Sequence, residues 1–235
     1  MTFRSLTTLL VLAAFAAACA PAAAPTEPSL AEPTAAAQRP TEPAPAEPTT
    51  AEVASGPTTF TFVAGETVAR FVVDEVLSGN PKTVIGETAA VTGELTLDSA
   101  APQQATLGTI EVDLTGLETD NGFRNRAIHE AILQTGKDGN QFATFTATQI
   151  EGLPETVSLG TSYELKITGD LTIKGTTRQV TFDAVVTPLS PERIEGTALL
   201  TIPYADFGVD IPFLPPQVAS VEDLVRLEID LVAAR

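Results

Sequence analysis

The sequence has little of the chemistry on which metal sites and disulfide-rich folds depend. Its 235 residues include one cysteine, one histidine, one methionine and no tryptophan. A single cysteine excludes a disulfide framework, and one histidine beside it cannot complete a zinc site of His and Cys ligands. We therefore expect neither a metal ion nor a cofactor that the protein keeps for catalysis.

Nucleophilic catalysis is equally hard to assemble. The only histidine is His129, and neither a Gly-x-Ser-x-Gly motif nor a phosphate-binding glycine loop occurs. Carboxylates are numerous, but most alternate with apolar residues and so fall on outward faces. The sequence predicts that the protein is not an enzyme.

Positive charge is also scarce. Lys and Arg number 13 against 30 Asp and Glu, which gives a formal net charge of −17. Such an acidic chain repels a phosphate backbone, so we expect no binding of nucleic acid.

The N-terminus has the pattern of an export signal. A basic start, Met1–Arg4, precedes an apolar run, Leu6–Ala18, that is shorter than the ~20 residues of a membrane span. Residues 1–18 are therefore predicted to be a signal peptide. The run ends in Ala-Ala-Ala followed by Cys19, which resembles a bacterial lipobox, although the three alanines would also suit ordinary signal peptidase. We expect an exported lipoprotein, anchored to a membrane through Cys19 and facing the periplasm or the cell exterior.

Residues 19–57 differ in composition from everything that follows. They contain half of the 18 prolines, many alanines and glutamates, and no aromatic residue. Such a segment cannot bury enough apolar surface to offset chain entropy, which predicts a disordered tether with a reach of roughly 35 to 120 Å. Residues 58–235 are left as one domain with a single core.

The clearest periodicity lies in Tyr163–Thr187. Apolar residues alternate with polar ones in two runs on either side of Gly175–Thr177, so the segment predicts an antiparallel hairpin with one dry face. Similar short runs recur along the domain between Gly, Pro and Asn, as in an antiparallel barrel of about eight strands. A barrel of that size is either filled by its own side chains or holds one small ligand, and the pattern leaves both open. The inward positions, which would line the interior, are Ala69, Phe71, Val73, Val91, Leu95, Ile110, Val112, Phe145, Leu165, Ile167, Leu171, Ile173, Val180 and Phe182.

One segment, Asp120–Gln134, has helical rather than strand spacing and a capping residue at its start. Its polar side carries Arg124, Arg126 and His129, which could either contact a polar ligand head group or form a solvated face paired with Glu130.

A proline-rich loop, Tyr204–Val218, contains Phe207, Phe213 and Leu214. Exposed apolar residues on a stiff loop indicate a lip over an apolar opening or a membrane contact, and capping of the barrel's bottom is the alternative.

The string Gly169–Phe182 (GDLTIKGTTRQVTF) resembles the signature of the YceI-like, lipid-binding family. Further matches in the same order extend the resemblance over about Phe60 to Ala233. The resemblance implies a lipocalin-like, eight-stranded antiparallel barrel with one short helix. It also implies that the barrel holds an isoprenoid lipid such as a quinone, or a fatty-acyl chain, as a carrier or scavenger without catalysis. The alternative is a cell-envelope interaction module with a self-filled barrel. The chain departs from its relatives at Asn125 and at Asn140–Gln141, and a homodimer is compatible with the sequence although no feature requires one.

Overall fold

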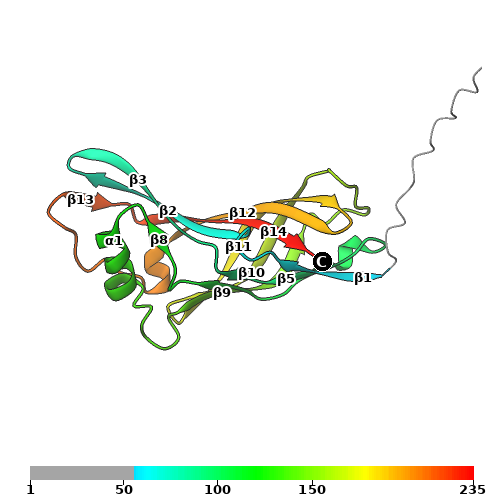
Figure 1. The fold of residues 1–235 in the computed structure, drawn as a ribbon, viewed down its shortest axis with the longest axis horizontal. Helices are drawn as coiled ribbons and strands as arrows, with labels where there is room; N and C mark the ends of the chain where they lie inside the picture. Colours follow the sequence, from blue (N-terminus) through cyan, green and yellow to red (C-terminus); the bar gives the residue numbers. More distant parts are fainter. Residues whose placement is uncertain (1–55) are drawn as a thin grey trace, which may run out of the picture. The chain divides into compact units, whose positions relative to one another are not determined.

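The alternating runs of the sequence form antiparallel strands in the computed structural model, which describes residues 56–235 (Figure 1). The elements are β1 (Pro57–Phe62), β2 (Val68–Leu77), β3 (Asn80–Thr88), β4 (Val91–Thr92), β5 (Glu94–Asp98), η1 (Pro102–Gln104), β6 (Thr106–Leu107), β7 (Ile110–Asp113), β8 (Glu118–Thr119), α1 (Gly122–Ala127), η2 (Ile128–Ile132), β9 (Phe142–Glu151), β10 (Tyr163–Ile173), β11 (Thr176–Ser190), β12 (Arg193–Pro203), η3 (Tyr204–Phe207), β13 (Val218–Val221) and β14 (Leu224–Ala234). The predictions for the signal peptide, for Cys19 and for the tether as far as residue 55 lie outside the described residues.

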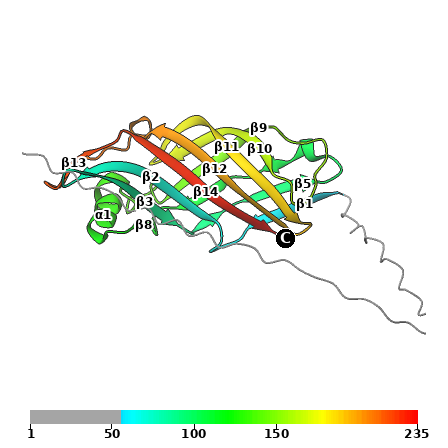
Figure 2. The same cartoon turned by 90° about the horizontal axis from the view of Figure 1, so that it is seen from above.

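The strands curl into a barrel. Hydrogen-bonded neighbours follow the order β4-β7-β9-β10-β11-β12-β14-β1-β5-β6. β4, at the start of this path, and β5, near its end, are consecutive in the chain and separated only by Gly93. The Gly93 carbonyl accepts a hydrogen bond from the Phe62 backbone N–H of β1 at 3.0 Å. The path therefore returns to β4, where it began. Seen from above, β11, β12 and β14 run side by side along the length of the domain (Figure 2). The predicted antiparallel barrel is confirmed.

The central hairpin forms with a tighter turn than we expected. Ile173 pairs with Thr176, so the connection is the two residues Lys174 and Gly175, and not Gly175–Thr177. Both turn residues have positive φ, 51° and 71°, as a two-residue turn with the right-handed twist of a hairpin requires. Thr177 belongs to β11 and pairs with Thr172.

β2 and β3 extend the sheet beyond the barrel at one end. β14 pairs with β2 through Arg226–Asp230 and with β1 only at Ala233 and Ala234, so the two strands share its edge. A second tight turn, Ser78–Gly79, folds β3 back along β2, and β3 pairs in turn with β8. β2 and β3 therefore form a hairpin.

The predicted helix is present and covers this extended end. α1 begins after Asn121, whose side chain accepts hydrogen bonds from the backbone N–H groups of Phe123 and Arg124, and it continues into the π-helical η2. Lys174 donates to the carbonyl oxygens of Ile132 in η2 and Gly208 after η3, at 2.9 and 3.2 Å. The central hairpin turn thereby ties together the two segments that lie over the barrel's end.

Near β1, the barrel interior holds buried aromatic and aliphatic side chains. Phe60 and Phe62 of β1 are 5% and 6% exposed and pack with Val91, Ile194 and Ala233 in the buried core. Gly93 provides room for this packing because a Cβ there would lie 2.8 Å from the Phe62 ring. These side chains fill the barrel interior beside β1.

Candidate functional site

An apolar cavity of about 430 Å³ lies inside the barrel at the α1 end. This volume is within the range of sites that take a small ligand, and the lining is mostly aliphatic and aromatic. Nine of the predicted lining residues border it: Ala69, Phe71, Val73, Ile110, Val112, Phe145, Leu171, Ile173 and Phe182. They come from β2, β7, β9, β10 and β11, so strands far apart in the sequence converge on one hollow.

Two aromatic rings border the cavity toward the packed end. Phe145 and Phe182, each 5% exposed, stand edge to face with their centroids 5.0 Å apart. Gly169 on β10 makes this arrangement fit, since a Cβ there would lie 2.4 Å from the Thr146 carbonyl oxygen and 2.7 Å from the Phe145 ring. The glycine of the signature string thus keeps the Phe145 ring against the barrel wall.

The other predicted lining residues do not border the cavity. Val91 belongs to the buried core, and Leu95, Ile167 and Val180 pack against that core. Leu165 is half-buried on β10, outside both the core cluster and the cavity lining. The prediction for these five residues needs correction, because alternation identifies the inward face of a strand and not the level at which the barrel is hollow.

A charged cluster that the sequence reading missed forms part of the cavity wall. Glu75 on β2 and Lys82 on β3 are paired across the two strands on the inward face, and both border the cavity. Arg124 Nη2 donates to Glu75 Oε1 at 2.8 Å and Arg124 Nη1 to Asp120 Oδ1 at 2.6 Å, while Lys82 Nζ donates to Asp120 Oδ2 at 2.7 Å. We call these four residues the charge network.

The charge network is held by burial at one end and by hydrogen bonds at the other. The Glu75 side chain is 6% exposed and that of Arg124 is 19%, whereas that of Asp120 is 60%. Hydrogen bonds from Lys82 and then Arg124 hold the pKa of the Asp120 carboxyl below its usual value. Along the inward face of β2, the apolar residues give way to a charged one at Glu75, which pairs with Arg124 of α1.

Of the three basic residues proposed to meet a head group, only Arg124 borders the cavity. Arg126 points to solvent with its side chain 74% exposed and lies 3.8 Å from Glu130, as the solvated-face alternative has it. His129 is structural: Nε2 lies 2.9 Å from the Leu117 carbonyl oxygen and Nδ1 lies 3.3 Å from Thr135 Oγ1. Asn125 accepts from the Thr119 N–H and hydroxyl at 2.8 and 2.6 Å and so anchors α1 to β8.

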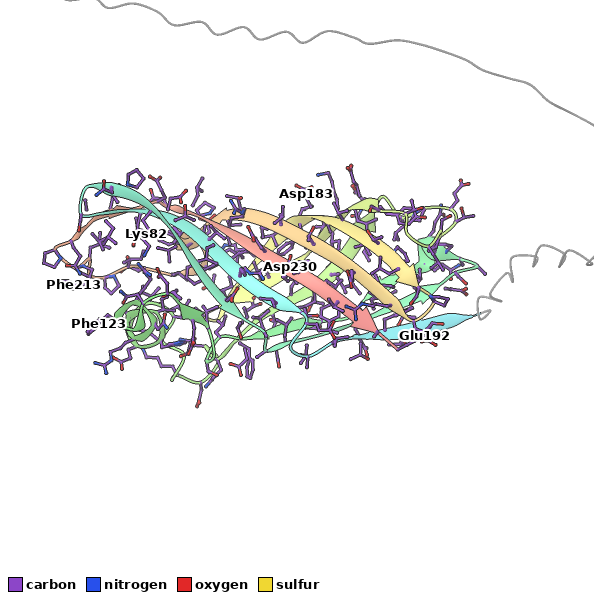
Figure 3. The ribbon with its side chains drawn as sticks, turned by 45° about the horizontal axis from the view of Figure 1, so that its top comes forward. Lys82, Phe123, Asp183, Glu192, Phe213 and Asp230 are labelled. Carbon is purple, nitrogen blue, oxygen red and sulfur yellow. The ribbon has the colours of Figure 1, made fainter. Side chains whose placement is uncertain are left out.

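Exposed apolar residues surround the cavity's opening. Phe123 on α1 is 88% exposed and Phe213 is 71% exposed, and both border the cavity together with Leu214. Figure 3 shows Phe123 and Phe213 at the same end as Lys82, far from Glu192. Phe207, which we grouped with them as a lip residue, is instead 1% exposed and belongs to the core.

Tyr204 and Gln217 add polar groups to the lining. Burial, and then the nearby Asp223 and Asp210, raise the pKa of the Tyr204 phenol, so it stays neutral at physiological pH. Within residues 56–235, no three His, Cys, Asp or Glu side chains gather as a metal site would require. In the same range no helix has the length and apolar character needed to cross a membrane.

Comparison with known proteins agrees with this architecture. The YceI-like domain family matches residues 60–233. A polyisoprenoid binding domain from Saccharophagus degradans, implicated in plant cell wall breakdown, is 17% identical with a TM-score of 0.59, over 74% of this chain and 97% of that one. BcnA from Burkholderia cenocepacia is 19% identical with a TM-score of 0.57, over 74% and 99%. The YCEI protein of Campylobacter jejuni is 18% identical with a TM-score of 0.51, over 64% of this chain and 84% of that one.

A search of curated proteins finds no match. At these identities the solved structures establish a shared fold and nothing finer. The family match, by contrast, spans the whole barrel from β1 to β14. This chain belongs to the YceI-like domain family.

Proposed function

We propose that the barrel binds a long-chain lipid, either an isoprenoid such as a quinone or polyprenyl lipid or a fatty-acyl chain, as a carrier or scavenger without catalysis. The observation that carries the proposal is the apolar cavity of about 430 Å³, whose opening is bordered by exposed Phe123 and Phe213. The polyisoprenoid binding domain from Saccharophagus degradans, which has the same fold, supports the choice of an isoprenoid.

The energetics favour a ligand with a long tail. The walls offer mostly carbon atoms, so affinity must come from burying the tail rather than from many polar contacts. At about 0.3 kcal/mol per heavy atom, a ligand of about 40 heavy atoms has a ceiling near 12 kcal/mol, which corresponds to a nanomolar dissociation constant. The packed end near β1 limits how deep the tail can enter, so part of a long tail must extend past the opening.

The test is to recover the protein from the membranes of the bacterium that makes it and extract it with organic solvent. Mass spectrometry should then find a stoichiometric lipid. In a second test, Gly169→Leu should reduce the lipid recovered from protein that remains folded, because the larger side chain would collide with the Phe145 ring beside the cavity. Repeated recovery of an empty parent protein that also fails to take up added quinone or fatty acid would instead favour an interaction module that binds a partner protein.

We further propose that the protein is an exported lipoprotein held to a membrane through Cys19. Its support is the sequence pattern of residues 1–19 alone. Several acyl chains make attachment effectively stable, whereas one holds a protein only marginally. Cys19→Ser should therefore move the protein from the membrane fraction to the soluble exported fraction, and an unchanged distribution would contradict the anchor.

A further inference from the structure

The charge network has no spare cation for an anionic ligand. Glu75 and Asp120 carry two negative charges, Arg124 and Lys82 carry two positive charges, and the four residues are joined by three ion pairs of 2.6 to 2.8 Å. The low pKa of Asp120 keeps its carboxylate ionised at neutral pH. A carboxylate or phosphate head group would have to displace one of these acids from Arg124 or Lys82, or remain unpaired beside buried Glu75.

One atom of the network is available to a hydrogen-bond donor. Glu75 Oε1 accepts from Arg124, whereas Oε2 has no hydrogen-bond donor within residues 56–235. Glu75 borders the cavity, and no fully buried side-chain nitrogen or oxygen of the described residues lacks a partner, so Oε2 retains some exposure. An ionised carboxylate only accepts hydrogen bonds, so it discriminates in favour of a head group with an O–H.

We propose that the charge network selects lipids with an uncharged, hydroxyl-bearing head group, such as an isoprenoid alcohol or quinol, over lipids with an anionic head. Glu75 is the specificity-determining residue: it accepts from the ligand hydroxyl and keeps Arg124 from pairing with an anion. The inference rests on the lipid-binding function proposed above, and it narrows that function by excluding free fatty acids and isoprenoid phosphates as preferred ligands.

Three ligands with the same tail and different heads test this selection. The full-length protein, freed of lipid, is loaded with radiolabelled geranylgeraniol, which is then displaced with unlabelled geranylgeraniol, geranylgeranial or geranylgeranoic acid at about pH 8. A hydrogen bond to a charged group predicts that the alcohol competes about tenfold to a hundredfold better than the acid. The aldehyde, which only accepts hydrogen bonds, should also compete less well than the alcohol.

Substitutions at the network should change the order of these ligands. Glu75→Gln removes the negative charge beside Arg124 Nη2, so a ligand carboxylate is no longer repelled there and the preference for alcohol over acid should fall by at least about tenfold. Asp74→Asn is the matched control, because Asp74 is the preceding residue of β2, on the outward face, where it accepts from Thr83 Oγ1 at 2.6 Å. Asp120→Asn, at a more exposed position, provides a second variant in the event that Glu75→Gln does not fold, and it should shift the preference in the same direction.

The possible outcomes distinguish failure of the head-group selection from failure of lipid binding itself. Parent protein that retains neither geranylgeraniol nor added quinone or fatty acid overturns both the lipid-binding function and the inference. Parent protein that retains a fatty acid but not geranylgeraniol overturns the inference alone. If the parent protein retains the alcohol, but the acid displaces it as well as unlabelled alcohol does, lipid binding stands. The proposed selection for an uncharged head group is then overturned. Unchanged preference in folded Glu75→Gln shows that Glu75 does not determine it.

Discussion

Ile173→Glu places a carboxyl group in the wall of the cavity and so tests whether the hollow holds the lipid tail. Ile173 is the last residue of β10 and borders the cavity. The neighbouring cation cannot readily neutralise the new group, because Lys174 is engaged with the carbonyl oxygens of Ile132 and Gly208. A bound tail would therefore surround the carboxyl group with hydrocarbon, and the cheapest response is for it to take up a proton.

The cost of that proton gives the expected loss of affinity. If water reaches the introduced carboxyl group in the ligand-free protein, its pKa there is near the ordinary value for glutamate, about 4.3. Protonating it on binding costs about 1.36 kcal/mol for each pH unit above that value, or about 3.7 kcal/mol at pH 7, which is roughly 500-fold in dissociation constant. At pH 5 the same cost is only about 1 kcal/mol, or roughly fivefold.

The sign of the pH dependence follows from the direction of the pKa shift. Binding raises the pKa of the introduced carboxyl group, so the complex takes up a proton and affinity should rise as the pH falls. The parent, which has isoleucine at this position, should lack this dependence. The assay is retention of radiolabelled geranylgeraniol at several pH values, with circular dichroism to establish that the variant is folded.

Thr172→Glu is the matched control, since Thr172 is the adjacent residue of β10 and its hydroxyl lies 2.8 Å from that of Thr177, on the opposite face. It adds the same charge without placing it in the cavity and should bind as the parent does. A folded Ile173→Glu protein that binds with parental affinity at pH 7 would refute the reasoning, because the tail would then not contact this wall.

Three further predictions concern stability. Lys174→Met removes two charge-assisted hydrogen bonds and should lower the free energy of unfolding, measured by urea denaturation, by about 1.5 to 3 kcal/mol. A loss below about 0.5 kcal/mol would show that these bonds do not hold the turn. Gly169→Ala brings a Cβ against backbone and ring atoms and should lower the free energy of unfolding by about 1 to 3 kcal/mol. Gly136→Ala, with no atom within 4 Å of the added Cβ, should leave that free energy nearly unchanged, and equal losses in the two variants would contradict the packing. The pKa of Asp120 is lowered on folding, so its stabilising contribution is present above its unfolded value of 3.8 and is lost as the pH falls through the folded pKa. Melting temperatures of the parent and Asp120→Asn should therefore differ at neutral pH and converge as the pH falls below 3.8, and a difference that does not shrink with falling pH would refute the linkage.

Local pattern was enough to predict the helix and most of the longer strands. The period of two identified the central hairpin and the inward faces of β2, β7, β9, β10 and β11, because alternate side chains of a strand must lie on opposite faces of a sheet. A change to helical spacing with a capping residue identified α1, and Asn121 caps it. These features depend on neighbours in the sequence, and so they can be read from it.

Turns were predicted less well than strands from the sequence. β1 was not predicted as a strand, and β3 was hidden behind Ser78–Gly79 and Pro81, which resemble a break rather than a two-residue hairpin turn. The central turn moved by one residue to Lys174–Gly175 because a lysine can adopt positive φ when its side chain is held by other segments. That support comes from residues more than 30 positions away.

Only the tertiary structure decided where the barrel is hollow and what its wall carries. Val91 and Val73 have the same inward pattern, yet Phe60 and Phe62 fill the interior near the first while the cavity opens beside the second. Glu75 has the same phase on β2 as Ala69, Phe71 and Val73, so its inward position was present in the sequence, but a charge there is tolerable only because Arg124 reaches it from α1 across 49 residues. Alternation determines which way a side chain points, whereas the space it meets and the partner it finds depend on how the distant strands and the helix pack together.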